Sequence, residues 1–268
     1  MFMKIIPIEG GLGAQIFGVM LFKYVSEQIS QDVLADVSYF KRAPKLAKLG
    51  EGISIFEWGL DYYGINKNDY EHDLPVKPSF IKRKLGIGSN VEVLTDGTVE
   101  RNDFLYKSFR VSYEKEFPIR DDHMVLAKKL VGGGLPTTVV HLRRGDYLNV
   151  ASHLVTDLHV VQIIKKLSTL GIRKILFVSD AEVPLSIYKE KVPEIKEWDS
   201  IVKGDIYLTH AVMRLARCLV ISNSQFSLSA AVLNKDATCF MPKKWFSGKS
   251  VDLHQHLHEL SDWHMVTI

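Results

Sequence analysis

The second half of the chain alternates apolar, strand-like segments with amphipathic, helix-like segments, and this alternation constrains the fold more than any other feature. Residues 137–142 (TTVVHL) and 174–180 (KILFVSD) are short apolar runs typical of buried strands. Between them, residues 157–171 repeat apolar side chains at helical spacing and end on a glycine. A second helix is predicted over 204–218, with Asp205 as its N-cap. Such alternation predicts a parallel sheet with helices on both faces.

The first half contains one clear unit of the same kind. Residues 4–8 (KIIPI) predict a strand, and the segment GGLGAQ (10–15) turns it into a helix. Residues 36–120 predict the helices and loops of a smaller domain, and VGGGLP (131–136) is the strongest interruption in the chain. We therefore expect two α/β domains, residues 1–135 and 136–268, with the last ~20 residues able to pack back on the first domain.

Length and composition exclude several classes of protein. The 268 residues, 46% of them hydrophobic, contain no apolar run of the roughly 18 residues that a membrane span needs. The opening MFMKIIPIEGG predicts a first strand rather than a signal peptide. Cys218 and Cys239 lie in apolar contexts and offer no disulfide framework. The sequence predicts a cytoplasmic protein.

The net charge of +3 is confined to the second half. Residues 1–135 hold 18 basic and 18 acidic side chains, and residues 136–268 hold 16 and 13. This small excess favours an anionic small ligand over nucleic acid, whose partners are usually more basic. The clusters IKRK (81–84) and PKKW (242–245) are compatible with peripheral contact to an anionic membrane face or with plain solvated surfaces.

Several polar residues follow the predicted strands. His141, Arg143, Asp180 and the turn 222–227 (SNSQFS) all fall at carboxyl ends, where parallel sheets bind ligands. Two adjacent arginines at a strand end require anionic partners, and guanidinium matches phosphate oxygens. A surface salt bridge is the alternative for the arginines. For Asp180 and for the turn 222–227, ligand binding and helix capping are equally compatible with the sequence.

The other candidate motifs are less specific. The segment GGLGAQ suits a phosphate loop or a tight structural turn, but Ile16 replaces the third glycine of a dinucleotide fingerprint. The tripeptide RGD (144–146) lacks the extracellular context of an adhesion motif. Three histidines in HQHLH (254–258) favour a solvated strand or loop over a metal site, and no metal ligand is predicted.

In order along the chain, these motifs resemble those of the bacterial α-1,2-fucosyltransferases that build surface polysaccharides. The family carries GGLGNQ(M/L)FQ, HxRRGDY, an FSDD-like strand end, NSTFSWWGA and PKKWF. The corresponding segments here are GGLGAQIFG (10–18), HLRRGDY (141–147), FVSDA (177–181), SNSQFSLSAA (222–231) and PKKWF (242–246). Two segments depart from the family pattern, since Ala14 replaces an asparagine and LSAA (228–231) replaces WWGA.

The resemblance implies a GT-B-like architecture of two Rossmann-type domains facing a cleft, the second holding GDP-fucose. It implies inverting, metal-independent transfer of L-fucose to a hydroxyl of a surface-polysaccharide glycan, such as the 2-OH of a galactoside. The donor and a glycan acceptor, which can be lipid-linked, are the expected partners, and the cytoplasmic membrane face is the expected location. The departures keep two alternatives open, namely another GDP-deoxyhexose as donor and a catalytically silent relative that binds nucleotide sugars.

Site residues follow from the same resemblance. Arg143 is expected to neutralise the diphosphate, and Asp146 is the first choice of general base, with Glu9 as the second. His141 and Asp180 are expected to hold the nucleoside, while Gly11 and Gly13 bring backbone to the diphosphate. The full set expected to bind the donor is Gly11, Gly13, Gln15, His141, Arg144, Asp180, Ser222, Asn223, Ser224, Gln225 and Ser227.

Overall fold

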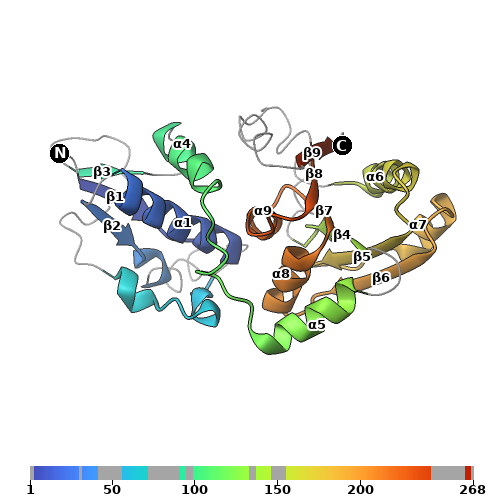
Figure 1. Ribbon diagram of the computed structural model, residues 1–268, viewed down its shortest axis with the longest axis horizontal. Helices are drawn as coiled ribbons and strands as arrows, with labels where there is room; N and C mark the ends of the chain where they lie inside the picture. Colours follow the sequence, from blue (N-terminus) through green and yellow to red (C-terminus); the bar gives the residue numbers. More distant parts are fainter. Residues whose placement is uncertain are drawn as a thin grey trace. The chain divides into compact units, whose positions relative to one another are not determined.

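A computed structural model describes the chain in two compact units, Met1–Pro118 and Ile119–Ile268 (Figure 1). The residues that it describes are 3–29, 32–41, 56–71, 91–94, 99–132, 137–145, 155–242 and 263–266. No helix within these ranges is long and apolar enough to cross a membrane.

The first unit is built on a three-stranded parallel sheet in the order β2-β1-β3. Its strands are β1 (Met3–Pro7), β2 (Val33–Asp36) and β3 (Val91–Val93). Its helices are α1 (Leu12–Gln28), α4 (Val99–Ser108) and the short 3-10 helices η1 (Leu60–Tyr63) and η2 (Lys67–Tyr70). The glycine segment joins the carboxyl end of β1 to α1, and Gly10 has a φ of +81°, a left-handed conformation that favours glycine.

The second unit contains a six-stranded parallel sheet in the order β6-β5-β4-β7-β8-β9. Its strands are β4 (Thr137–Leu142), β5 (Lys174–Ser179), β6 (Glu197–Val202), β7 (Cys218–Val220), β8 (Thr238–Pro242) and β9 (Trp263–Val266). When the strands are numbered within the unit, their order is 3-2-1-4-5-6, which is that of the Rossmann fold. In this fold all strands are parallel, but the order in which they are added to the sheet reverses between the first and fourth strands. The reversal therefore falls between β4 and β7.

Helices cover both faces of this sheet, as the sequence predicts. They are α5 (Asp121–Val131), α6 (Asp157–Thr169), α7 (Leu185–Lys191), α8 (Ile206–Leu215) and α9 (Gln225–Val232). On one face, Val140 and Phe177 pack in a core with side chains of α6 and α7. Side chains alternate along a strand, so His141 points to the other face, where it contacts Phe226 of α9. The predicted N-cap is confirmed, because Asp205 accepts hydrogen bonds from Tyr207 N and Leu208 N, at the start of α8.

The division between the units falls at Pro118, before α5, whereas the sequence suggests a boundary at 135. Helix α5 packs against α8 and so belongs to the second unit, although the glycine-rich segment follows it in sequence. At the other end of the chain, β9 pairs with β8 in the sheet of the second unit. The four described residues nearest the C-terminus thus join that sheet.

Candidate functional site

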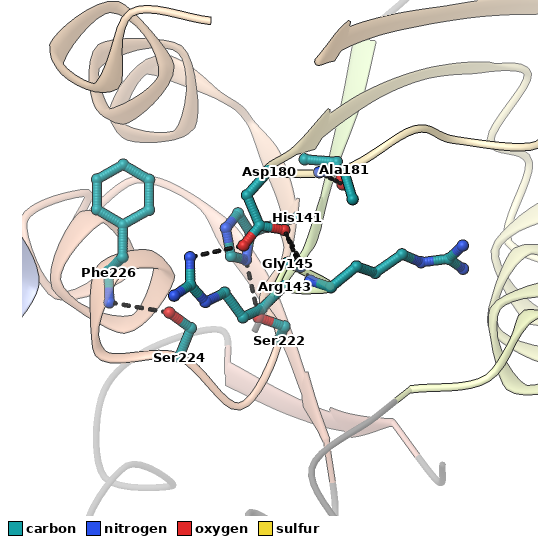
Figure 2. A network of polar contacts seen from close by, with 10 residues as sticks. His141, Arg143, Gly145, Asp180, Ala181, Ser222, Ser224 and Phe226 are labelled. Carbon is teal, nitrogen blue, oxygen red and sulfur yellow. Dashed lines mark hydrogen bonds and ion pairs between the residues drawn. The ribbon is translucent and has the colours of Figure 1, made fainter. Parts of the chain in front are cut away.

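Polar side chains from three neighbouring strands meet at the carboxyl edge of the second sheet (Figure 2). His141 lies in β4 and Arg143 directly follows this strand, while Asp180 follows β5 and Ser222 follows β7. The predicted convergence of these residues is therefore confirmed. It lies where β4 and β7 meet, the switch point at which Rossmann-type sheets bind ligands.

Arg143 and Asp180 form an ion pair at this edge. Arg143 Nη1 donates to Asp180 Oδ2 over 2.6 Å, and the two side chains are 30% and 28% exposed. Asp180 Oδ1 accepts hydrogen bonds from the backbone N–H groups of Arg144 and Gly145, at 2.7 and 3.0 Å. One carboxylate therefore fixes both the guanidinium and the turn that carries it, so the role of Asp180 is to position Arg143.

Gly145 has a structural role that the sequence analysis did not identify. A Cβ at this position would lie 2.8 Å from Asp180 Oδ2, so any other residue would force the Asp180 carboxylate to shift. The close approach of the Gly145 backbone is what lets Asp180 accept both amide hydrogens. The signal in the sequence was the glycine directly after the arginine pair.

His141 is buried beside this ion pair. Its Nδ1 lies 2.8 Å from Ser222 Oγ, a hydrogen bond that joins β4 to the segment after β7. The pKa of His141 is lowered to about 4, chiefly by burial; the nearby charge of Asp180 opposes this shift and that of Arg143 adds to it. The imidazole is therefore neutral at physiological pH and offers a ligand a hydrogen bond without a charge.

The turn after β7 is held by its own hydroxyls. Ser224 caps α9 by accepting a hydrogen bond from Phe226 N at 3.3 Å. Ser227 Oγ donates to the carbonyl oxygens of Ser222 and Ser224, at 3.3 and 3.2 Å. Asn223 is buried and Gln225 is exposed. The buried hydroxyl of Ser227 thus shapes the turn, and the predicted helix cap is confirmed at Ser224.

Phe226 is a further member of this cluster that the sequence did not single out. Its ring packs near those of both His141 and His210, with centroid distances of 5.8 and 5.4 Å. His210 is completely buried in α8, and its Nε2 lies 3.2 Å from Ser229 Oγ. Burial, together with the charge of Arg214, lowers the pKa of His210 well below its usual value. The serine of the LSAA segment thus bonds to a buried neutral histidine.

Arg144 points away from Arg143, which corrects the interpretation of the two as a pair. Its guanidinium donates to Asp157 Oδ1 and, over 2.8 Å, to Tyr188 Oη. Tyr188 Oη in turn donates to Asp157 Oδ1 at 2.5 Å. The Arg144 side chain is only 9% exposed. These contacts tie the turn after β4 to α6 and α7, so Arg144 is occupied by structural partners rather than presented to a ligand.

In the first unit, the glycine segment begins α1. Gly11 is the N-cap residue, and Gly13 is buried in the first turn. The Gln15 amide, predicted to bind the donor, instead bonds to the backbone at Gly10, Glu57 and Gly59. Its side chain is buried, and these bonds give it a structural role.

Some predicted residues lie outside the described part of the chain. These are Asp146, the first choice of general base, the histidines of 254–258, and residues 243–246 of the PKKWF segment. Glu9, the second choice of base, is partly buried just before the glycine segment. Among the residues that are described, no group of three or more His, Cys, Asp or Glu side chains lies close enough together to hold a metal ion.

Comparison with known proteins gives a match in structure alone. No known family model matches the sequence, and no curated protein matches it. The glycosyl transferase family 9 structure from Veillonella parvula covers 98% of this chain and 86% of its own, with a TM-score of 0.52 and 8% identity. For E. coli ADP-heptose LPS heptosyltransferase II the coverages are 98% and 89%, the TM-score 0.50 and the identity 10%. The chain has a GT-B-like fold.

The expected α/β, GT-B-like fold class is thereby confirmed. A structure of POFUT1 in complex with GDP-fucose is also similar, with a TM-score of 0.47, 15% identity, and coverage of 87% of this chain and 94% of that one. In the GT-B-like chain described here, the second unit presents a partly exposed guanidinium, a neutral histidine and a hydroxyl-rich turn at the switch point of its sheet. This arrangement is suited to holding an anionic ligand.

Proposed function

We propose that the protein is a glycosyltransferase whose nucleotide-sugar donor binds at the carboxyl edge of β4, β5 and β7. The observation that carries the proposal is the Arg143–Asp180 pair, fixed at the switch point with its guanidinium partly exposed. A fixed, permanently charged guanidinium suits a diphosphate group. The GT-B-like fold supports the same function.

The proposed donor is GDP-fucose, and the proposed reaction is inverting, metal-independent transfer to a glycan hydroxyl, such as a galactoside 2-OH. The support is the order of the segments GGLGAQIFG, HLRRGDY, FVSDA and SNSQFSLSAA, which resembles that of the bacterial α-1,2-fucosyltransferases. A second candidate, a different GDP-deoxyhexose as donor, is favoured by Ala14 and by Leu228 and Ser229, where the family has an asparagine and two tryptophans.

In this reaction the bond between the sugar and the diphosphate breaks as an electron-poor sugar cation develops. Negative charge grows on the departing diphosphate. A hydrogen-bond donor that is already in place stabilises this charge at little reorganisation cost. Arg143 is the residue proposed for this role, and Asp180 holds it in position before the donor arrives. His141, neutral and bonded to Ser222, is proposed to hydrogen-bond the nucleotide. Asp146 is kept as the proposed general base.

The test is calorimetric titration of the purified chain with GDP, GDP-fucose, GDP-mannose and UDP-sugars in the presence of EDTA. We expect GDP and GDP-fucose to bind without metal, and Arg143→Ala to weaken both. The matched control is Arg217→Ala, because Arg217 is exposed directly before β7, at the opposite, amino edge of the same sheet. Binding of UDP-sugars alone, or equal loss in both variants, would contradict the proposal.

An acceptor screen then separates an enzyme from a silent binding relative. With GDP-fucose and a panel of galactosides, an active enzyme releases GDP at a rate that depends on the acceptor. Arg143→Ala should reduce this rate by roughly 100- to 1000-fold, the usual effect of removing one fixed donor to a developing anion. Donor that binds tightly but is never consumed with any acceptor would support the silent relative instead.

A further inference from the structure

The loop at residues 56–59 in the first unit is fastened to the glycine segment by one buried side chain. Gln15 Nε2 donates to the carbonyl oxygens of Gly10 and Glu57, each at 2.8 Å. Gln15 Oε1 accepts a hydrogen bond from Gly59 N at 2.9 Å. Gln15 is 1% exposed, so its amide group is shielded from water. The start of α1 and this loop therefore form one rigid assembly.

The consequence of this assembly is the position of Phe56. Its ring lies so close to Gly11 that a Cβ on Gly11 would be 3.2 Å from Cε1 and 3.4 Å from Cδ1 of the ring. The backbone of Gly11 has φ −75° and ψ 176°, an extended conformation open to any residue. Glycine is thus favoured at position 11 by contact with Phe56 and not by backbone strain. The space that a side chain would fill is occupied by an aromatic ring.

Phe56 remains partly open to solvent. It is 37% exposed, and it is the one aromatic among the large apolar side chains that stand exposed in the described parts of the chain. Other aromatic rings of the first unit pack against each other, as Phe17 does with Phe109 and Tyr63 with Phe117. A phenyl ring that is held rigidly and left exposed at the carboxyl end of β1 is suited to binding, because little ordering is needed when a ligand arrives.

Two acidic residues lie near this ring along the backbone. Glu57 follows Phe56 directly and is exposed, and Glu9 is partly buried at the start of the glycine segment to which the loop is fastened. An exposed apolar ring on a loop that also carries an acidic residue suits a pyranose. One face of such a sugar presents C–H groups, which the electron-rich face of an aromatic ring attracts, and its edge presents hydroxyls that donate to carboxylates.

We propose that Phe56, held against Gly11 by the Gln15 bonds, is the platform on which a pyranose ring of the acceptor glycan stacks. This inference rests on the proposed function, since it assigns the acceptor to the first unit of a glycosyltransferase. It also gives the glycine segment a role as a support for the acceptor platform, in place of direct contact with the diphosphate.

The test measures sugar binding and nucleotide binding separately on the full chain. Saturation-transfer NMR with methyl glycosides of galactose, glucose, mannose and N-acetylglucosamine reports the sugar, and calorimetry with GDP reports the nucleotide. We expect Phe56→Ala to weaken binding of the preferred glycoside about 10-fold while leaving the GDP affinity unchanged. Phe56→Trp should retain sugar binding, with a change in tryptophan emission on addition of the glycoside.

The matched control is Phe104→Ala. Phe104 is also a partly buried aromatic of the first unit, but it lies by Lys4 at the amino end of β1, opposite the glycine segment. Glycoside binding should survive this change. The platform is rejected if Phe56→Ala binds the glycoside as well as the wild type, if Phe104→Ala loses binding equally, or if the wild type binds GDP but none of the glycosides. A wild type that fails to bind GDP would instead reject the proposed function.

Discussion

Asp180 binds Arg143 with one carboxylate oxygen and the backbone after Arg143 with the other. The 2.6 Å ion pair and the two amide hydrogen bonds are all made by the Asp180 side chain. The position of the Arg143 guanidinium and the conformation of the turn after it therefore depend on each other. Variants of Asp180 and of its neighbours separate this positioning role from the general stability of the second unit.

Replacing Asp180 by asparagine should impair catalysis more than folding. Asparagine keeps the size of the side chain but removes the charge that orients Arg143, and its amide group cannot accept hydrogen bonds at both positions. We expect turnover of GDP-fucose to fall by ~10- to 100-fold, a fraction of the effect of removing a fixed donor outright. Steady-state kinetics and thermal unfolding measure the two effects. Asp199→Asn, an exposed carboxylate in β6, is the control and should leave turnover unchanged.

Tyr188→Phe should lower stability without altering donor binding. The change removes the hydroxyl that links Arg144 to Asp157 and leaves the buried guanidinium with one partner fewer. The expected loss in the free energy of unfolding is about 1–3 kcal/mol, the usual cost of an unsatisfied buried donor. Urea denaturation gives this value. A large loss of GDP affinity in folded Tyr188→Phe would show that Arg144 also faces the ligand.

Gly145→Ala should weaken GDP binding, whereas Gly171→Ala should lower stability and leave binding unchanged. A Cβ at Gly145 would displace Asp180 and so misplace Arg143, which should weaken GDP binding by ~10-fold or more, on the scale of one charge-assisted hydrogen bond. Gly171 has a φ of +87° with open space around it, so alanine there is strained by roughly 1–2 kcal/mol while the site is untouched. Calorimetry and urea denaturation on both variants separate binding from stability.

Stability should decrease between about pH 6.5 and pH 4 because His141 must gain a proton when the chain unfolds. Burial lowers its pKa from 6.5 to about 4 in the folded state, so the stabilisation is complete above the unfolded value and disappears as pH falls through the folded one. The difference corresponds to roughly 3 kcal/mol. Urea denaturation from pH 7 to pH 4 should show a shallower slope for His141→Asn.

His210 provides the comparison for this pH effect. It is buried with a lowered pKa as well, so His210→Asn should also reduce the slope. Only His141 adjoins the Arg143–Asp180 pair, and only its variant should change the GDP affinity. An unchanged slope in His141→Asn would mean that the folded protein accommodates its charged form.

The sequence predicted helices such as α6 and α8, the parallel sheet and the convergence of polar residues on one edge, because these follow from local periodicity and from the rule for parallel strands. It could not give the strand order, because periodicity within a segment does not say which strand it pairs with. The order depends on which strands pair across long separations, as β4 does with β7. The domain boundary differs for a related reason, because the packing of α5 on α8 is a tertiary contact.

Within the site, residue type was a poor guide to role. Arg143 and Arg144 are identical and adjacent, yet alternation along an extended segment sends their side chains to different partners. Gln15 lies in a motif that suggests ligand binding, but its amide is used by backbone groups, two of them more than 40 positions away in sequence. Phe226 carries no polar signal, so only the structure identifies it as a neighbour of His141.

The hydrogen bond between His141 and Ser222 has a consequence for how the protein acquires its activity. The two residues are 81 positions apart, and β5 and β6 lie between them in the chain. During synthesis, β4 can pair with β5 well before β7 has emerged from the ribosome. The proposed donor site, by contrast, must wait until β7 docks on the free side of β4, a closure over a long loop. Competence to bind a nucleotide should therefore appear late in folding, after most of the helical content has formed.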